Sequence, residues 1–355
     1  MSRDDRAVRS VTGLACDGTA RDASGKAVDA AADAAAGGTR HATLDSAGAA
    51  AAAAAQDAAQ TGLQADLIAV LVAIDDDRPR VLGLGGGSML PSGPLERAHR
   101  SLQAGLRSWV EQQTHHPIGF VEQLYTFADR DRSAGEVRAI SISYLALTRM
   151  AAGDTGWRDW YGYFPWEDQR SAAGAQAAAR LAERLLAWAD AGGNEAAGRR
   201  QRCAINFGLD GMPWDEELVL QRYELLYEAG LVAEARPPEP LPPEAGRPML
   251  HDHRRILATG IARLRARIKY RPVVFELMPP SFTLLQLQQA FEALAGRRLH
   301  KQNFRRLVES QNLVEETGQL AGRAIGRPAK LFRFRREVLQ ARHVAGSKLP
   351  LTRLG

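Results

Sequence analysis

Two short amphipathic segments near the C-terminus constrain the fold most strongly, because a tight turn joins them. Thr283 suits the N-cap of a helix predicted over 284–295, and Gly296 suits the end of that helix. A second helix is predicted over about 300–311. Apolar side chains recur at helical spacing and give each helix an inner face: Leu287, Phe291 and Leu294 in the first, and Phe304, Leu307 and Val308 in the second. This arrangement is typical of a helix-turn-helix unit.

The outward face of the second predicted helix is polar and basic. Amide side chains can pair with adenine and arginine with guanine in the major groove, where the N-terminal half of such a helix usually meets the bases. We therefore expect DNA contacts from five residues of this helix: Lys301, Gln302, Asn303, Arg305 and Arg306.

A basic hairpin is predicted directly after the second helix. Residues 313–316 and 329–334 read as its two strands, and the loop 317–328 contains glycines and arginines. Cations on such a loop suit phosphates or the minor groove, so Arg323, Arg327 and Lys330 are further candidates for DNA contact. The alternative is a helix pair that packs against a partner protein, but the basic hairpin favours DNA.

Charge is divided unevenly along the chain. The net charge is +5, but residues 250–355 hold 21 basic against 7 acidic residues, whereas the remainder holds 25 against 34. This division favours a module that binds a polyanion, attached to an acidic partner domain. The alternative is a solvated basic surface without a partner.

The residues before this module predict an α/β domain over 65–235, preceded by a disordered extension over 1–64 that is poor in large apolar side chains. Within the domain, a dense aromatic loop is expected over 157–166. The predicted strands cover 67–74, 80–84, 121–127 and 137–147, and the predicted helices cover 95–113, 172–189 and 214–229.

A proline-rich stretch over 236–249 predicts an extended linker between two domains. After it, a helix predicted over 252–270 opens a DNA-binding domain over 250–340, and 341–355 form a tail. Leu257, Ile261, Leu264 and Ile268 share one face of this helix, and four arginines are expected mostly off that face: Arg254, Arg263, Arg265 and Arg267.

The spacing from Gly93 to Arg107 matches the Nudix box, whose carboxylates hold Mg²⁺ in active hydrolases. The acidic positions of the box fall on His99, Ser108, Glu111 and Gln112, so only Glu111 is an acid. One carboxylate should bind Mg²⁺ too weakly to drive phosphoanhydride cleavage. Taken alone, this stretch also fits a plain amphipathic helix.

Together with its C-terminal motifs, the chain resembles the Nudix-related transcriptional regulators of NAD metabolism. The resemblance is close over 250–336, looser over 66–170, and leaves 171–235 unexplained. It implies a Nudix-like α/β/α sandwich followed by an α+β winged helix-turn-helix domain. The segments that carry it are Asp252-His253, Tyr270–Leu277, Phe282–Leu284, Asn303–Arg306 and Gly326–Phe334.

The resemblance also implies a function. We expect a homodimeric repressor of NAD biosynthesis or salvage genes that binds a palindromic double-stranded operator and responds to an NAD-related nucleotide such as ADP-ribose. It implies no catalysis and no required cofactor. The candidate ligand residues are Arg107 and Arg138 for phosphate, Glu111, and Tyr144, which could stack on adenine together with Trp160 and Phe164. Core packing is favoured for these three aromatic residues, and Arg107 could instead form an ion pair.

A hydrolase of ADP-ribose or a related nucleotide sugar is the alternative function. It would need other acids, such as Glu96 or Glu122, to rebuild a metal site. A purely structural interaction protein is hard to reconcile with the basic hairpin.

The longest apolar run, 67–74, is too short to span a bilayer, and the two cysteines, Cys16 and Cys203, supply neither a disulfide framework nor a metal cluster. These features predict a cytoplasmic protein without a membrane partner or a bound metal.

Overall fold

The computed structural model describes residues 64–75, 77–116, 118–128, 139–151, 153–237, 240–270, 273–322 and 328–335. Residues 1–63 of the predicted extension lie outside the described residues, and so does the predicted tail over 341–355.

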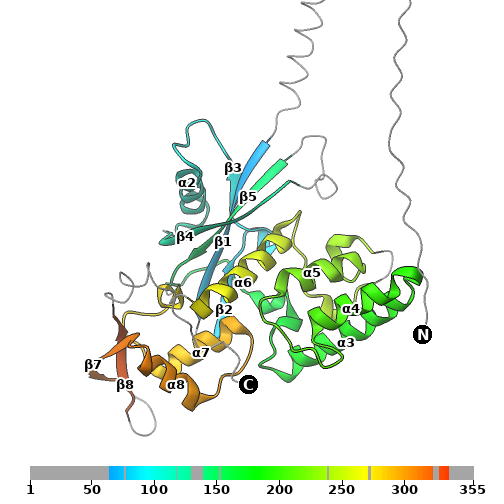
Figure 1. Ribbon diagram of the computed structural model, residues 1–355. Coiled ribbons are helices and arrows are strands. Elements are labelled where there is room, and N and C mark those ends of the chain that lie inside the picture. Colours follow the sequence, from blue (N-terminus) through cyan, green and yellow to red (C-terminus); the bar gives the residue numbers. More distant parts are fainter. Residues whose placement is uncertain are drawn as a thin grey trace, which may run out of the picture. The chain divides into compact units, whose positions relative to one another are not determined.

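A mixed β-sheet forms the centre of the first part of the chain (Figure 1). Strand β1 is its long central strand, parallel to β5 on one side and antiparallel to β2 and β3 on the other. The path across the sheet is β4-β5-β1-β2-β6, so β4 and β6 are edge strands. The strands are β1 (Gln64–Asp75), β2 (Arg78–Leu82), β3 (Ser92–Pro94), β4 (Phe120–Phe127), β5 (Ala139–Leu147) and β6 (Trp157–Asp159).

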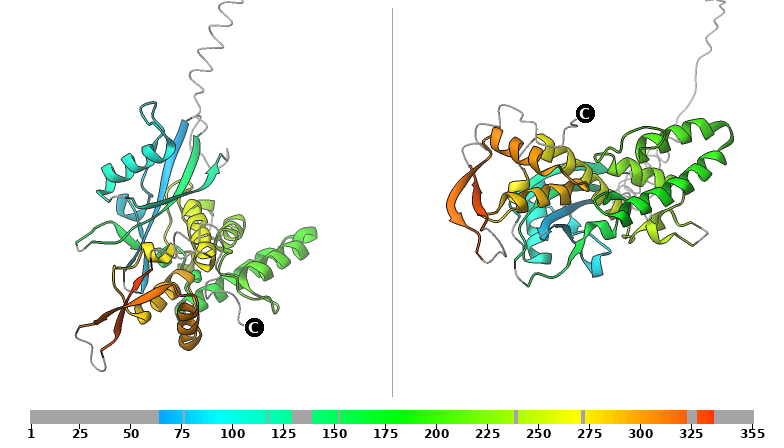
Figure 2. Two further views of the ribbon diagram at one scale, coloured as in Figure 1. Left: turned by 60° about the vertical axis from the view of Figure 1, so that its left-hand side comes forward. Right: turned by 90° about the horizontal axis from the view of Figure 1, so that it is seen from below.

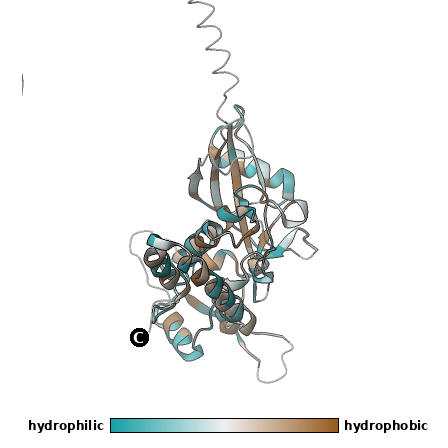
Figure 3. Ribbon diagram, turned by 90° about the vertical axis from the view of Figure 1, so that its right-hand side faces the viewer, coloured by the Kyte–Doolittle hydropathy of each residue, from teal (hydrophilic) through white to brown (hydrophobic). Residues whose placement is uncertain are grey.

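Helices cover both faces of this sheet, and alternate residues of β1 explain why. Leu67, Ala69 and Leu71 are buried with the apolar residues of α2 (Leu102–Thr114), whereas Ile68, Val70 and Val72 are buried with those of α6 (His253–Tyr270). A strand that is apolar on both faces needs a cover on each side. The expected α/β/α sandwich is confirmed, and the strands carry much of the hydrophobic colour in Figure 3.

Helix α2 begins seven residues later than the sequence pattern predicts. Ser101 takes the N-cap position, and its hydroxyl accepts a hydrogen bond from Ala104 N at 3.1 Å. The residues before it form turns, in which His99 Nδ1 accepts a hydrogen bond from Glu96 N at 3.1 Å. A local side-chain cap therefore fixes the helix start.

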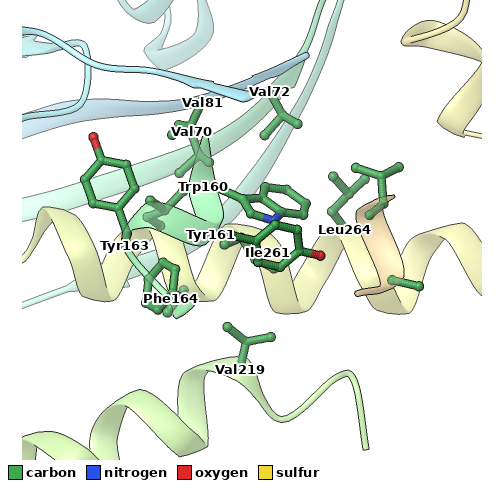
Figure 4. Close-up of a cluster of buried hydrophobic side chains, with 14 of the residues drawn as sticks. Val70, Val72, Val81, Trp160, Tyr161, Tyr163, Phe164, Val219, Ile261 and Leu264 are labelled. Carbon is green, nitrogen blue, oxygen red and sulfur yellow. The ribbon is translucent and has the colours of Figure 1, made fainter. Parts of the chain in front are cut away.

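The aromatic segment predicted as a loop lies in the core. It forms β6 and two 3-10 turns, Trp160–Gly162 and Pro165–Glu167. Trp160, Phe164 and Trp166 are completely buried. Figure 4 shows Trp160 among side chains from the sheet, such as Val70 and Val81, and from α6. These rings fill the space between layers, as the favoured core-packing interpretation predicted for Trp160 and Phe164.

Three further helices follow the aromatic segment, α3 (Ala172–Asp190), α4 (Ala196–Phe207) and α5 (Val219–Glu228) (Figure 2). Helix α3 matches its prediction, and α5 begins later than predicted. The sequence pattern does not predict α4, because the buried stripe of this helix is narrow: only Cys203, Ala204 and Phe207 are buried, amid several arginines.

The proline-rich segment is not a free linker between two domains. Ala245 is buried, and its carbonyl oxygen accepts a hydrogen bond from Arg254. Helix α6, predicted to open the DNA-binding domain, contacts β1, β4, β5 and α5. The expected boundary at 236–249 is therefore placed too early, because α6 is the second helical layer of the sandwich.

Helix α6 buries its predicted apolar face in full, with Leu257, Ile261, Leu264 and Ile268 at most 1% exposed. Two of the four arginines expected mostly off that face are buried as well. Arg254 and Arg265 are completely buried, because each finds carboxylate and carbonyl partners inside the protein.

The C-terminal part adopts the predicted winged helix-turn-helix order: α7 (Leu284–Ala295), α8 (Lys301–Ser310), and a hairpin of β7 (Val314–Leu320) and β8 (Lys330–Phe334). A bridge between Phe282 and Phe332 adds a third extended segment to the hairpin. Among the described helices, none combines the length and apolarity needed to cross a bilayer.

Candidate functional site

Local signals and an aromatic contact help to position the two helices of the helix-turn-helix unit. A capping box starts α7: Gln286 N donates to Thr283 Oγ1 at 3.2 Å, and Gln286 Oε1 accepts from Thr283 N at 2.8 Å. Gly296 ends α7 in the left-handed region, with φ of 72°. The rings of Phe291 and Phe304 then meet edge to face at 5.5 Å. This packing fixes which face of α8 points outward.

The outward face of α8 is the candidate DNA-reading surface. Lys301, Gln302, Arg305 and Arg306 are exposed, whereas Phe304 and Val308 are buried. Asn303 is half-buried, and its Oδ1 accepts a hydrogen bond from Arg306 at 3.2 Å. Within the described residues, Lys301 and Arg305 have no carboxylate partner. Four exposed cationic or amide side chains therefore share one helix face.

A buried polar pair that the sequence pattern did not predict holds the turn between α7 and α8. Gln288 and Glu292, one helical turn apart, are 7% and 5% exposed. Glu292 Oε1 accepts hydrogen bonds from Leu299 N at 2.9 Å and from Gln288 Nε2 at 2.9 Å, and Gln288 also donates to Leu299 O at 3.1 Å. The signal in the sequence that could have revealed this pair is the four-residue spacing of Gln288 and Glu292 on the inner, otherwise apolar face of α7.

The hairpin carries cations that already have partners. Lys330 lies 2.8 Å from Glu316 across the two strands, and Arg333 lies 2.6 Å from Glu315. Lys330 is exposed, so a phosphate could reach it in competition with Glu316. Arg323 and Arg327, predicted for the same role, lie outside the described residues.

The predicted effector residues that the structure describes are Arg107, Glu111 and Tyr144. Arg107 donates to the carbonyl oxygens of Ile118 and Gly119, so it ties α2 to the loop before β4 instead of forming the ion pair considered as an alternative. Glu111 is exposed on α2. Tyr144 is 1% exposed within an apolar cluster, so its predicted contact with a nucleotide is not supported. Arg138 lies outside the described residues.

Other features of the Nudix-box stretch have packing explanations. A side chain at Gly93 would collide with the Trp109 ring, whose Nε1 donates to Pro94 O at 2.9 Å. Among the described residues, neither of the two acids considered for the hydrolase alternative belongs to a group of carboxylates that could hold a metal. Glu96 lies in an exposed turn, and Glu122 pairs with Arg267 of α6. No cluster of metal-binding side chains occurs in the described part of the chain.

A buried ion network joins the sandwich to the helix-turn-helix unit. Glu167 binds Arg222 of α5 at 2.6 Å and also contacts Arg265 of α6, and all three side chains are at most 1% exposed. Burial alone would raise the pKa of Glu167, but the two guanidinium groups hold that pKa below its ordinary value.

The same network holds the end of α7. Arg265 Nε donates to Leu294 O at 2.9 Å, and Tyr161 Oη donates to Ala293 O at 2.6 Å. Two residues of the sandwich thus take up backbone carbonyls that a helix end leaves unsatisfied. The first helix of the helix-turn-helix unit is consequently anchored to the sandwich, and not only tethered to it.

Comparisons with known proteins match the C-terminal part of the chain. Residues 274–334 match the family described as the NrtR DNA-binding winged helix domain. The ADPR responsive transcriptional repressor NtrR of Acinetobacter baylyi is 42% identical over 85 residues, which cover 23% of this chain and 33% of the relative. The chain therefore matches only about a third of the length of that curated relative.

Solved structures align over more of the chain at lower identity. NrtR of Shewanella oneidensis, crystallised with a 27mer DNA, is 21% identical with a TM-score of 0.45, covering 76% of this chain and 93% of that one. A MutT/nudix family protein from Enterococcus faecalis is 14% identical with a TM-score of 0.44, covering 77% and 87%. The assignment rests on the C-terminal sequence match and on the geometry of α7, α8 and the hairpin: residues 274–334 form a winged helix domain of the NrtR type.

Proposed function

We propose that this chain is a transcriptional regulator that binds operator DNA through α8 and represses genes of NAD biosynthesis or salvage. The exposed face of Lys301, Gln302, Arg305 and Arg306, on a winged helix of the NrtR type, carries this proposal. Asn303, Lys330, Arg323 and Arg327 remain predicted contacts. The related repressor of Acinetobacter baylyi supports the repressing role.

In this proposal the protein acts as a homodimer in the cytoplasm. One winged helix reads a short half-site, and two copies related by a two-fold axis would read a palindrome with strict spacing. A shift in the relative placement of the two α8 helices would then change the affinity for the operator.

The proposed effector is ADP-ribose or a related nucleotide, sensed by a non-catalytic Nudix-like sandwich. The name of the Acinetobacter relative supports this effector, and the anchoring of α7 by Arg265 and Tyr161 supplies a physical connection between sandwich and reading helix. Only one acid of the Nudix box remains, and Glu122 is paired with Arg267. No specific observation favours the hydrolase alternative.

DNA binding is tested by fluorescence anisotropy with duplexes taken from upstream of NAD-synthesis genes in the same genome. We expect Lys301→Ala and Arg305→Ala each to weaken specific binding by about 1–3 kcal/mol, because each removes a contact to a base or phosphate. Arg184→Ala, which removes an exposed arginine on α3, is the matched control and should bind like the parent. Parental binding by both α8 variants would show that this helix does not read DNA.

The effector is tested in the same assay. ADP-ribose should shift the midpoint of the DNA titration, because a ligand that prefers one arrangement of the dimer changes its population. Chromatography of the same mixture with Mg²⁺ should show no AMP. An unchanged midpoint would remove the effector from the proposal, and released AMP that disappears in Glu111→Gln would favour the hydrolase.

A further inference from the structure

A cleft with a volume of about 510 Å³ lies between the edge strand β4 and the helices α4, α5 and α6. This volume falls in the range typical of small-molecule sites, roughly 300–1,000 Å³. Of the described residues that the sequence predicted for the effector, none lines it. Its walls include Tyr125 and Phe127 from β4, Arg202 from α4, Gln221 from α5 and Arg255 from α6.

Tyr125 lines this cleft with an aromatic ring that the surrounding fold holds in place. Its side chain is 60% exposed, which is unusual for so large a ring. The pairing of β4 with β5 shifts register between Gln123 and Thr126, so Tyr125 sits in a β-bulge. The completely buried Ser143 fixes that bulge: its hydroxyl donates to Tyr125 O at 2.8 Å and accepts from Tyr125 N at 3.3 Å. Bulges often re-aim a side chain beside a functional site.

The Tyr125 ring is also supported from one side. The centres of the Tyr125 and Phe127 rings lie 5.0 Å apart in an edge-to-face arrangement, and the guanidinium of Arg255 lies 4.9 Å from the centre of the Phe127 ring. Contacts that run from Arg255 through Phe127 to Tyr125 therefore support the Tyr125 ring, while Tyr125 remains 60% exposed.

The charged groups of the cleft neutralise one another. Arg202 forms two hydrogen bonds with Glu228, and Arg255 pairs with Glu224. A phosphate would have to displace a carboxylate from an arginine and would then face two acids. The exposed amide of Gln221 offers both a donor and an acceptor without charge. The lining therefore favours a ligand group that is flat, uncharged and able to form hydrogen bonds at its edge.

From this geometry we infer that the cleft binds the uncharged heteroaromatic ring of a ligand, a purine base such as adenine, stacked on Tyr125. This deepens the proposed function and rests on it, since the base would belong to the nucleotide effector. Two of the helices that form the cleft, α4 and α5, come from the segment 171–235 that the resemblance left unexplained.

Helix α6 connects this cleft to the DNA-binding unit. Arg255 and Thr259 line the cleft, and Arg265, about 15 Å further along the same helix, donates to the end of α7. A base that moves the N-terminal half of α6 would therefore act directly on the group that anchors α7.

The inference is tested by isothermal titration calorimetry of the full chain with adenosine. The parent should bind adenosine, and Tyr125→Ala should weaken binding by about tenfold or more, because the stacked ring is lost. Tyr125→Phe should retain binding, since the ring remains. Leu95→Ala, at an exposed apolar position outside the cleft, is the control and should match the parent. Inorganic pyrophosphate should not compete with adenosine.

Three results would overturn the inference: no binding of adenosine to the parent, equal binding by Tyr125→Ala, or competition by pyrophosphate. Failure of this inference is distinguishable from failure of the proposed function. If ADP-ribose shifts the DNA titration equally in the parent and in Tyr125→Ala, the effector response stands and its site lies elsewhere. If ADP-ribose has no effect on either while adenosine binds at Tyr125, the cleft stands and the assigned effector is wrong.

Discussion

His253, the first residue of α6, shows how burial fixes the protonation state of a single side chain. It is 6% exposed, and its Nδ1 accepts a hydrogen bond from Leu90 N at 2.8 Å. Burial, with a smaller contribution from His251, lowers the pKa of His253 to about 4. The neutral ring is therefore part of the folded structure, because a protonated Nδ1 could not accept this bond.

Stability should consequently depend on pH through His253. Its pKa in the unfolded chain is about 6.5, so between pH 6.5 and pH 4 the unfolded state binds more protons than the folded state. The free energy of unfolding should fall across this window as the pH is lowered, by up to about 3 kcal/mol. Urea titrations at several pH values would measure it. His253→Asn, which retains an acceptor without a titrating group, should flatten that dependence, and an unchanged slope would contradict the assignment.

Helix α7 shows which properties of an element are local and which are tertiary. Its capping box and the glycine that ends it are readable from adjacent residues, so its predicted bounds, 284–295, are confirmed. The close packing at its end is not readable in this way. A Cβ at Gly296 would lie 2.3 Å from Glu167 O and 2.8 Å from a guanidinium nitrogen of Arg265. Gly296 is therefore required both by its positive φ and by the approach of the buried ion network.

Substituting two glycines should separate these effects. We expect Gly296→Ala to destabilise the fold by more than about 1 kcal/mol, since it adds strain at positive φ to a backbone collision. Gly198→Ala is the control: this glycine lies in the exposed part of α4 with nothing near its missing Cβ. Alanine there should stabilise by up to about 1 kcal/mol. Thermal unfolding of both variants measures the difference, and equal shifts would exclude the tertiary constraint.

At the scale of the whole molecule, the Glu167 network joins the aromatic segment, α5, α6 and the end of α7. Arg222 and Arg265 are completely buried cations that share this one carboxylate. The network joins the predicted sensor to the predicted DNA-binding unit, which the sequence pattern separated by an extended linker over 236–249. We therefore expect the two parts to unfold together.

Glu167→Gln should destabilise the protein by about 3–5 kcal/mol, because it leaves two buried guanidinium groups without a countercharge. Glu195→Gln, which breaks the exposed pair with Arg199 on α4, should cost less than about 1 kcal/mol. Because the pKa of Glu167 is lowered in the folded state, its contribution should be present above the ordinary carboxyl range and lost as the pH falls below it. Urea unfolding with far-ultraviolet circular dichroism measures both variants, and a loss for Glu167→Gln no larger than for the control would contradict this role.

The sequence by itself determined the elements that short-range signals specify. The two helices of the helix-turn-helix unit, the hairpin strands, α3 and the apolar strand β1 follow from caps, glycines and the spacing of apolar residues, which act over a few residues. It also predicted the polar, cationic outer face of α8, since helical spacing places Gln302 and Arg306 opposite Phe304 and Val308.

Only the tertiary structure decided what the remaining polar and aromatic residues do. Arg107 donates to carbonyls of the loop before β4, Tyr144 and Trp160 are covered by other layers, and Arg265 binds Glu167, which lies 98 residues earlier in the chain. Tyr125 is exposed because of a bulge that depends on Ser143 of the neighbouring strand. Burial and ion pairing depend on which segments of the chain pack together in space. Residue type and local spacing do not specify that packing.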